Sequence, residues 1–240
     1  MTLRDQVVDK TESTLPLKCL ALAEYQQLVA DSTILEQDKS GIKVFETPEG
    51  LIVKLFRRKR LLTSAIFKPY ATRFVENARR LNSLGIKTVT IEAVYRCAPI
   101  KRTLIVYQPV PGRTLRDALR NAVDPDKFIT QFAAFFSELH DKGVLFRSIH
   151  LNNIIVSDSV DAMGLIDIAD MKVFNKGLAF SQRIRNLRHL SRYKDDRQSI
   201  KAFGVERFVD IYFSAGKLAS LHKEDFLVKM QSIIDADDSI

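Results

Sequence analysis

The chain has 240 residues, 46% apolar and 28% charged, which is an ordinary composition for a folded protein and enough length for one large domain or two small lobes. Its two cysteines, Cys19 and Cys97, exclude a disulfide framework and a cysteine-based metal site, and they favour a reducing compartment. Residues 1–10 are charged and lack the apolar core of a signal peptide, and no apolar run of about 18 residues predicts a membrane-spanning helix. We therefore expect a cytoplasmic protein.

The net charge is +8, from 37 Lys and Arg against 29 Asp and Glu. Such an excess attracts phosphate groups on nucleic acid, anionic lipid or phosphorylated sugars, although a solvated basic surface explains it equally well. Aromatic residues do not alternate with the basic runs as they do on single-strand-binding surfaces, which disfavours nucleic acid as a partner. Much of the basic excess lies in two groups, Arg57, Arg58, Lys59, Arg60, Lys68 and Arg73 in the first half and Arg183, Arg185, Arg188 and Arg192 in the second.

The first half of the chain predicts mainly strands. Residues 17–30 follow Pro16, contain neither Pro nor Gly, and predict a short helix. Beyond residue 33 the pattern becomes that of short strands separated by Gly- and Pro-containing turns. One helix interrupts them at residues 70–84, where apolar residues recur at helical spacing up to Gly85. The predicted strands are 33–37, 42–47, 51–56, 88–97 and 103–108.

The second half predicts mainly helices after a break at Pro109-Val-Pro-Gly112. Thr114-Leu-Arg-Asp117 is typical of a capped helix start, and the aromatic stripe from Phe128 to Leu139 indicates the buried face of a helix that ends at Gly143. A small hairpin, 154–157 with 163–168, precedes a helical remainder. These elements predict an α+β fold of two lobes. Residues 1–108 form the first lobe, with an N-terminal helix followed by a five-stranded antiparallel sheet that has one helix between its strands. Residues 109–240 form a mostly helical second lobe that carries the hairpin.

Residues 146–156 have the pattern of a kinase catalytic loop with one residue changed. The pattern is H-R-D-L-x-x-x-N, with the asparagine five residues after the aspartate. Here Arg147 is kept, Asn153 stands five residues after Ser148, and Ser148 takes the place of the aspartate. A serine hydroxyl does not accept a proton as a carboxylate does, and losing a general base costs roughly 10²–10⁴ in rate. Because phosphoryl transfer depends largely on positioning and charge stabilisation, slow catalysis is still compatible with serine.

Two neighbours of Ser148 are further candidates for catalysis. His150 is suited to act as a substitute base or to bind phosphate, and the alternative is a histidine bonded within its own loop. Arg147 is suited either to organise the loop or to bind substrate anions.

Three residues have the chemistry to handle a nucleotide and its metal. Lys54 stands inside an apolar strand, where its ammonium must reach an anion or water, and in kinases a lysine at this position binds the α- and β-phosphates. Asp167 ends an apolar strand fourteen residues after Asn153, and together they offer oxygen ligands of the kind that Mg²⁺ prefers. Asp170 is a second metal candidate, with a solvated loop carboxylate as the alternative.

Two parts of the kinase pattern are weak. Gly41 is the only glycine where a Gly-rich phosphate loop would lie. Glu76 is the available partner for Lys54, but it lies about 160–200° from the predicted buried face of its helix, so we expect it to be solvated.

On these residues the chain resembles the lipopolysaccharide-core and Kdo sugar kinases of Gram-negative bacteria, within the protein-kinase-like superfamily, and is most similar to the branch labelled toluene-tolerance proteins. The resemblance covers roughly residues 33–213. It implies a two-lobed protein-kinase-like fold, ATP and Mg²⁺, and transfer to a hydroxyl of a lipid-linked sugar at the inner face of the cytoplasmic membrane. The segments that carry it are 53–56, 84–88, 107–115, 146–156, 165–167 and 185–190.

Carried over by position, the resemblance assigns phosphate binding to Lys54, metal binding to Asn153 and Asp167, and adenine binding to the backbone from Gln108 to Val110. Because Ser148 departs from the family's aspartate, two hypotheses stay open. The first is an ATP-dependent phosphotransferase acting on a lipopolysaccharide-type sugar. The second is a pseudokinase that binds nucleotide, a partner or the anionic membrane, and regulates envelope biogenesis without catalysis.

Overall fold

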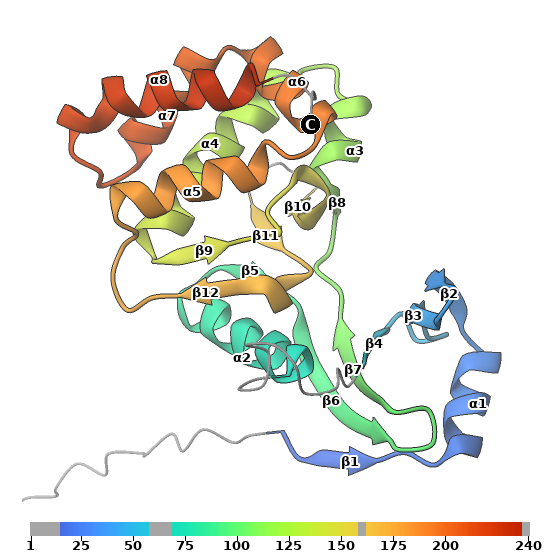
Figure 1. Ribbon diagram of the computed structural model, residues 1–240. Helices are drawn as coiled ribbons and strands as arrows, with labels where there is room; N and C mark the ends of the chain where they lie inside the picture. Colours follow the sequence, from blue (N-terminus) through green and yellow to red (C-terminus); the bar gives the residue numbers. More distant parts are fainter. Residues whose placement is uncertain (1–14, 58–68, 158–161, 237–240) are drawn as a thin grey trace, which may run out of the picture. The chain divides into compact units, whose positions relative to one another are not determined.

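The computed structural model describes residues 15–57, 69–157 and 162–236 (Figure 1). Within these ranges the chain is a mixed α+β protein with eight α-helices and three β-sheets. It divides into two compact units. Unit 1 takes its described residues from 15–57 and 92–106, and unit 2 takes them from 69–91, 107–157 and 162–236.

Unit 1 is built on a six-stranded sheet that contains four of the predicted strands and, from Thr90 onward, the strand predicted over 88–97. β2, β3 and β4 form an antiparallel meander, as their turn chemistry predicts. The strands run in the order β1-β6-β7-β4-β3-β2, with bounds β1 Leu17–Cys19, β2 Thr33–Asp38, β3 Gly41–Glu46, β4 Ile52–Arg57, β6 Thr90–Cys97 and β7 Arg102–Gln108.

The start of the chain corrects one prediction. The expected helix over 17–30 is shorter: α1 spans Leu22–Ala30, and the residues before it form β1, which pairs in parallel with β6. Leu17 lies opposite Val94, and the Leu20 amide donates to the Arg96 carbonyl at 3.0 Å. All three residues of β1 are exposed, so no apolar alternation marks it in the sequence, and its partner is distant along the chain.

The core of unit 1 explains where Lys54 points. Val53 and Leu55 are buried on one face of β4, in a cluster with Phe45 and Leu104 against which α1 packs. Because successive side chains of a strand point to opposite faces, Lys54 lies on the other face, where it is half-buried.

α2 (Tyr70–Ser83) groups with unit 2, whereas the predicted boundary at residue 108 placed it in the first lobe. Its buried face includes Phe74, Ala78 and Leu81, at the predicted helical spacing. Asn77 on the same helix donates from Nδ2 to the carbonyl of Ile168 at 2.7 Å, which ties α2 to the segment around the candidate metal ligands.

The helices of unit 2 pack around an aromatic core. The predicted stripe lies on α4, where Phe132 and Phe136 are fully buried against α7 and contribute to a core that also contains Tyr212 and Phe226. The predicted helix cap is also present, since Thr114 Oγ1 accepts from the Asp117 amide at 3.1 Å. The helices are α3 Leu115–Arg120, α4 Pro125–Asp141, α5 Phe180–Leu190, α6 Lys194–Phe203, α7 Val205–Ala215 and α8 Lys223–Ile234.

Two small sheets complete unit 2, and the predicted hairpin is part of one of them. β10 (Ile154–Val156) pairs antiparallel with β11 (Met163–Leu165), which ends before the predicted residue 168. β11 also pairs with β5 (Lys87–Thr88), so the predicted strand 88–97 is split between two sheets. The order is β5-β11-β10-β8, with β8 at Arg113–Thr114, while β9 (Val144–Phe146) pairs with β12 (Met171–Val173).

Gly112 shows why the segment before β8 needs a glycine. Its φ is +126°, a conformation that other residues rarely adopt, and a Cβ there would lie 2.1 Å from the carbonyl oxygen of Val156. Among the helices of the described ranges, none combines the length and the apolar character needed to cross a bilayer.

Candidate functional site

The loop between β9 and β10 carries the predicted catalytic residues. Ser148 is half-buried, and its carbonyl oxygen accepts a hydrogen bond from Asn153 Nδ2 at 2.8 Å. Asn153 is 6% exposed and lies in a short 3₁₀ turn, Leu151–Asn153. Because the amide nitrogen of Asn153 binds within the loop, its Oδ1 is left as the group able to contact a cation.

Asn153 and Asp167 are brought together by the strand pair that they flank. The backbone amide of Ile166 donates to the carbonyl of Asn153 at 3.1 Å, next to the pairing of Ile154 with Leu165. The carboxylate of Asp167 therefore follows β11 at the same end of the pair where Asn153 precedes β10. Within unit 2, the backbone therefore brings the two residues predicted to bind a metal to the same end of one strand pair.

Asp167 also has an unusual backbone. Its φ of 52° and ψ of 44° lie in the left-handed region, and within the described part of the chain only Lys101 is another non-glycine residue with positive φ. Such a conformation costs on the order of 1–3 kcal/mol and persists where the surrounding structure imposes it, often at functional sites. The Asp167 side chain is exposed, while Ile168 and Ala169 after it are buried and fix the turn.

The negative charge of Asp167 affects two more side chains of unit 2. The pKa of Tyr107 is raised, mainly by burial and additionally by the negative charge of Asp167. The pKa of His150 is lowered, mainly by burial, although the carboxylates of Asp196 and Asp167 oppose the effect. Within unit 2, His150 and Tyr107 thus interact electrostatically with Asp167, and Ser148 is joined to Asn153 by the hydrogen bond described above.

His150 is held by packing. Its ring lies 4.7 Å from the Tyr193 ring, and its Nδ1 is buried without a hydrogen-bond partner among the described residues. The alternative in which this nitrogen is bonded within the loop is therefore not observed. Because burial lowers its pKa below the usual value of about 6.5, the imidazole is neutral at physiological pH and able to accept a proton.

Arg147 organises the loop. Its guanidinium forms an ion pair with Asp170, whose same carboxylate oxygen lies 3.2 Å from Arg73 Nη2 on α2, and its amide donates to the Asp170 carbonyl at 3.0 Å. Of the two predicted roles, the structure supports loop organisation. Asp170 is not a solvated loop carboxylate, and because it is shared by two guanidinium groups it is a poor metal ligand.

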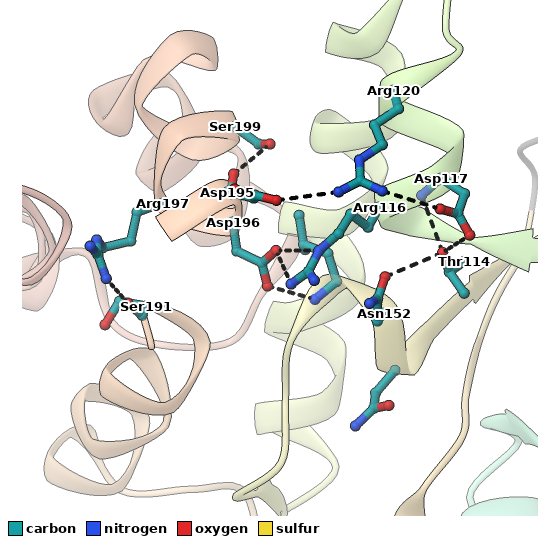
Figure 2. A network of polar contacts seen from close by, with 12 residues as sticks. Thr114, Arg116, Asp117, Arg120, Asn152, Ser191, Asp195, Asp196, Arg197 and Ser199 are labelled. Carbon is teal, nitrogen blue, oxygen red and sulfur yellow. Dashed lines mark hydrogen bonds and ion pairs between the residues drawn. The ribbon is translucent and has the colours of Figure 1, made fainter. Parts of the chain in front are cut away.

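Asp196, which sequence reasoning missed, anchors the loop from α6 (Figure 2). Its Oδ1 accepts from Arg116 Nε at 3.0 Å and Nη2 at 2.6 Å, and its Oδ2 accepts from the Leu151 amide at 2.8 Å. Asp196 is 0% exposed, whereas its neighbour Asp195 has a side chain 59% exposed and lies 3.3 Å from Arg120. In the sequence, two adjacent aspartates indicate a solvated helix start. Only the burial of one and the exposure of the other, which the folded structure shows, distinguishes Asp196 from Asp195.

A second buried network holds the start of the loop. The Asn186 side chain brackets Phe146, because Oδ1 accepts from its amide at 3.2 Å and Nδ2 donates to its carbonyl at 2.7 Å. His140 contacts Asn186 Oδ1 through Nε2 at 3.2 Å and the Tyr212 hydroxyl through Nδ1 at 2.7 Å. Burial, with a further effect of Arg183, lowers the pKa of His140 to about 3, so it is neutral.

Arg183 requires a correction to the predicted basic surface. It is 3% exposed, pairs with Asp141 at 2.7 Å and donates to the Tyr212 hydroxyl at 2.8 Å, so it belongs to this buried network. Arg185, Arg188 and Arg192 are exposed, as predicted. Arg58, Lys59, Arg60 and Lys68 lie outside the described residues.

The remaining predicted site residues divide between the units. Lys54 belongs to unit 1, and Asn153 and Asp167 belong to unit 2, so their convergence on one nucleotide stays a prediction. In unit 2, Gln108 is exposed and Val110 is half-buried. The side chain of Val110 packs against Gly164 of β11, because a Cβ built on Gly164 would lie only 2.9 Å from Val110 Cγ1.

Glu76 lies in unit 2 and is half-buried, which corrects the expectation that it is solvated.

The described residues contain no group of three or more His, Cys, Asp or Glu side chains placed to hold a metal by themselves. Mg²⁺ commonly takes only one or two carboxylates and completes its coordination with water and substrate phosphates, so the oxygens of Asn153 and Asp167 suit this ion. A scan against models of protein families finds no match, and a search of curated proteins finds no similar sequence.

Proposed function

We propose that the chain is an ATP- and Mg²⁺-dependent phosphotransferase of protein-kinase-like fold, with an atypical catalytic loop in which Ser148 replaces the aspartate. The observation that carries the proposal is the position of Asn153 just before β10 and of Asp167 just after β11, at the same end of this strand pair, with Asp167 held in a left-handed conformation. An exposed carboxylate kept in a strained backbone beside a buried amide is better explained by ligand binding than by packing.

Each residue of the site has a proposed role. Lys54 binds the phosphates of ATP, the backbone from Gln108 to Val110 meets adenine, and the oxygens of Asn153 and Asp167 hold Mg²⁺. The bound ion would neutralise negative charge on the phosphates. Lys54 is on the face of β4 opposite the apolar core, which leaves its ammonium on the side away from Val53 and Leu55.

His150 takes the role of general base that Ser148 cannot fill. A neutral imidazole accepts the proton of the acceptor hydroxyl, whose oxygen forms a bond to the γ-phosphorus while the bond from that phosphorus to the bridging oxygen of ADP breaks. The lowered pKa of His150 keeps the ring in the accepting form at neutral pH. The Ser148 hydroxyl is suited to position the acceptor by a hydrogen bond.

The acceptor in this proposal is a hydroxyl of a lipopolysaccharide-core or related lipid-linked sugar. It follows from the resemblance of the loop and strand motifs, and it implies a cytoplasmic protein that works at the inner membrane. Exposed Arg185, Arg188 and Arg192 are compatible with peripheral contact with anionic lipid.

A second candidate function is that of a pseudokinase that binds nucleotide, a partner or the anionic membrane, and regulates envelope biogenesis. It is favoured by Ser148 in the aspartate position and by Arg147, whose guanidinium is occupied by Asp170.

Nucleotide binding tests what both candidates share. Mg-ATP at 100 times its dissociation constant is expected to stabilise the protein by about 2.7 kcal/mol, measured as a rise in unfolding temperature. Lys54→Ala and Asp167→Asn should lose most of this rise, whereas Lys43→Ala, which removes an exposed lysine from the neighbouring strand, should keep it. An equal rise in the wild type and in Lys54→Ala would contradict the proposal.

Phosphate transfer from labelled ATP to core oligosaccharide separates the two candidates. We expect His150→Gln to lower the turnover roughly 10²–10⁴-fold while leaving stabilisation by Mg-ATP unchanged. The turnover of the wild type should fall at acid pH with an apparent pKa below about 6.5, because protonation removes the base and burial shifts that step downward. A wild-type turnover no higher than that of Asp167→Ala would favour the pseudokinase.

A further inference from the structure

A groove of about 690 Å³ runs between α5 and α8, on helices that carry none of the residues proposed to bind the nucleotide or its metal. The two helices lie side by side (Figure 1). Each offers one stripe of residues to the groove, at the four-residue spacing that places side chains on the same helix face. On α5 the stripe includes Phe180, Ile184 and Arg188, and on α8 it includes Val228 and Ser232.

The lining of the groove is apolar and basic. Its apolar side chains are Phe180, Ile184, Val228 and Ile233, and Val228 is 63% exposed although it is purely apolar. The charged side chains are Arg185, Arg188 and Lys229, with no Asp or Glu among the lining residues. Arg185 and Arg188 are exposed, and Lys229 is half-buried and lies 2.9 Å from Asp225.

We propose that this groove binds the acyl chain of an anionic phospholipid at a membrane surface, with the arginines on the headgroup. Apolar side chains accept the hydrocarbon chain, and cations at the same groove accept the phosphate, as expected of an interfacial site. A lipid whose headgroup carries no net negative charge would lack the electrostatic attraction between that headgroup and Arg185 and Arg188.

The groove has the volume of a small-molecule site. Small-molecule sites commonly have volumes of about 300–1,000 Å³ and mostly apolar linings with a few polar groups, which matches this groove.

Vesicle binding by the full chain, measured by sedimentation without nucleotide, tests the charge requirement. The protein should bind vesicles of equimolar phosphatidylglycerol and phosphatidylcholine, and not vesicles of phosphatidylcholine alone. Arg185→Gln with Arg188→Gln should weaken binding about 30-fold, at about fivefold per cation. The matched control, Lys87→Gln with Lys172→Gln, removes two exposed cations of the same unit that do not line the groove and should change binding much less.

A tryptophan reporter tests the groove itself. The chain contains no tryptophan, so Val228→Trp creates a single reporter at an exposed groove position. Phosphatidylglycerol with brominated acyl chains should quench its fluorescence, because bromine quenches only at close contact. A tryptophan at Val123, which is fully exposed on the same unit outside the groove, should not be quenched.

The outcomes are distinct. Absence of vesicle binding overturns the proposal and leaves a protein partner as the occupant to test. Vesicle binding without quenching at position 228, or equal loss in both double variants, also overturns it, because the attraction would then be that of a general basic surface.

The proposal names the lipid contact that the proposed function anticipates, but it does not require phosphate transfer. Stabilisation by Mg-ATP should be unchanged in Arg185→Gln with Arg188→Gln, so a failure of either proposal is recognised separately.

Discussion

The two units hold their predicted site residues in different ways. In unit 1, Lys54 is carried by a strand whose inner face packs in an apolar cluster with Phe45 and Leu104. In unit 2, the loop with Ser148 and Asn153 is held by buried polar groups, through Asp196 at its middle and Asn186 at its start.

The difference follows from what each backbone needs. A strand in a sheet already has its backbone hydrogen bonds made by its neighbours, so non-directional apolar packing is enough to position it. A loop without such neighbours leaves amide and carbonyl groups unpaired, and buried side chains must bind them in specific directions. The conformation of the loop in unit 2 therefore depends on the buried polar side chains of Asp196 and Asn186.

The largest effect is expected from Asp196→Ala. It removes the partner of a partly buried arginine, Arg116, and of the Leu151 amide, so the free energy of unfolding should fall by about 3–5 kcal/mol, measured by urea denaturation. Asp195→Ala, one residue earlier and exposed, should change it by less than about 0.5 kcal/mol. Equal losses in the two variants would mean that the buried bonds do not hold the loop.

A loss of stability is also expected in unit 1, where its cause is the removal of apolar packing rather than of buried hydrogen bonds. Leu104→Ala removes a fully buried side chain from the apolar cluster and should lower the free energy of unfolding by about 2–5 kcal/mol, with faster hydrogen exchange of the β3 and β4 amides. Leu35→Ala on β2, where the side chain is 52% exposed, is the matched control and should have little effect. If β3 and β4 kept their protection in Leu104→Ala, apolar packing would not be what holds the strand of Lys54.

A smaller effect should appear as a pH dependence of the polar network in unit 2. His140 has a pKa of about 3 in the folded protein, below the unfolded value of about 6.5, so its contribution is present above 6.5 and is lost as the pH falls towards 3. One unit below the unfolded value, at about pH 5.5, the wild type should have lost about 1.4 kcal/mol of its unfolding free energy from this residue alone. The difference in slope between wild type and His140→Gln, from urea titrations across this range, measures it, and identical slopes would contradict the assignment.

Much of the architecture could be predicted from local patterns. The strands of the meander, the helix 70–84, the aromatic stripe of α4 and the hairpin after the loop all follow from apolar spacing and turn residues, and the structure has them. The neighbourhood of Asn153 and Asp167 was also predictable, because a hairpin brings together the residues that flank its paired strands.

Other features could not be read from any local pattern. β1 is exposed and short, and it exists only because β6 supplies its hydrogen bonds. Arg183 and Arg185 are two residues apart in one basic helix, yet Arg183 is buried in an ion pair with Asp141, whereas Arg185 is exposed. Similarly, Asp170 became a shared partner of Arg73 and Arg147, although in the sequence it has the features of a loop carboxylate.

The sequence by itself determined the order and type of most elements and the kinase-like spacing of Arg147, Ser148 and Asn153, because period and spacing are properties of neighbouring residues. Tertiary structure alone decided which charged side chains are buried, that Asp196 and Asn186 hold the loop, and that a basic apolar groove lies between α5 and α8. The reason is physical: the cost of burying a charge depends on partners supplied by distant segments, and only the folded chain brings those partners within hydrogen-bond distance.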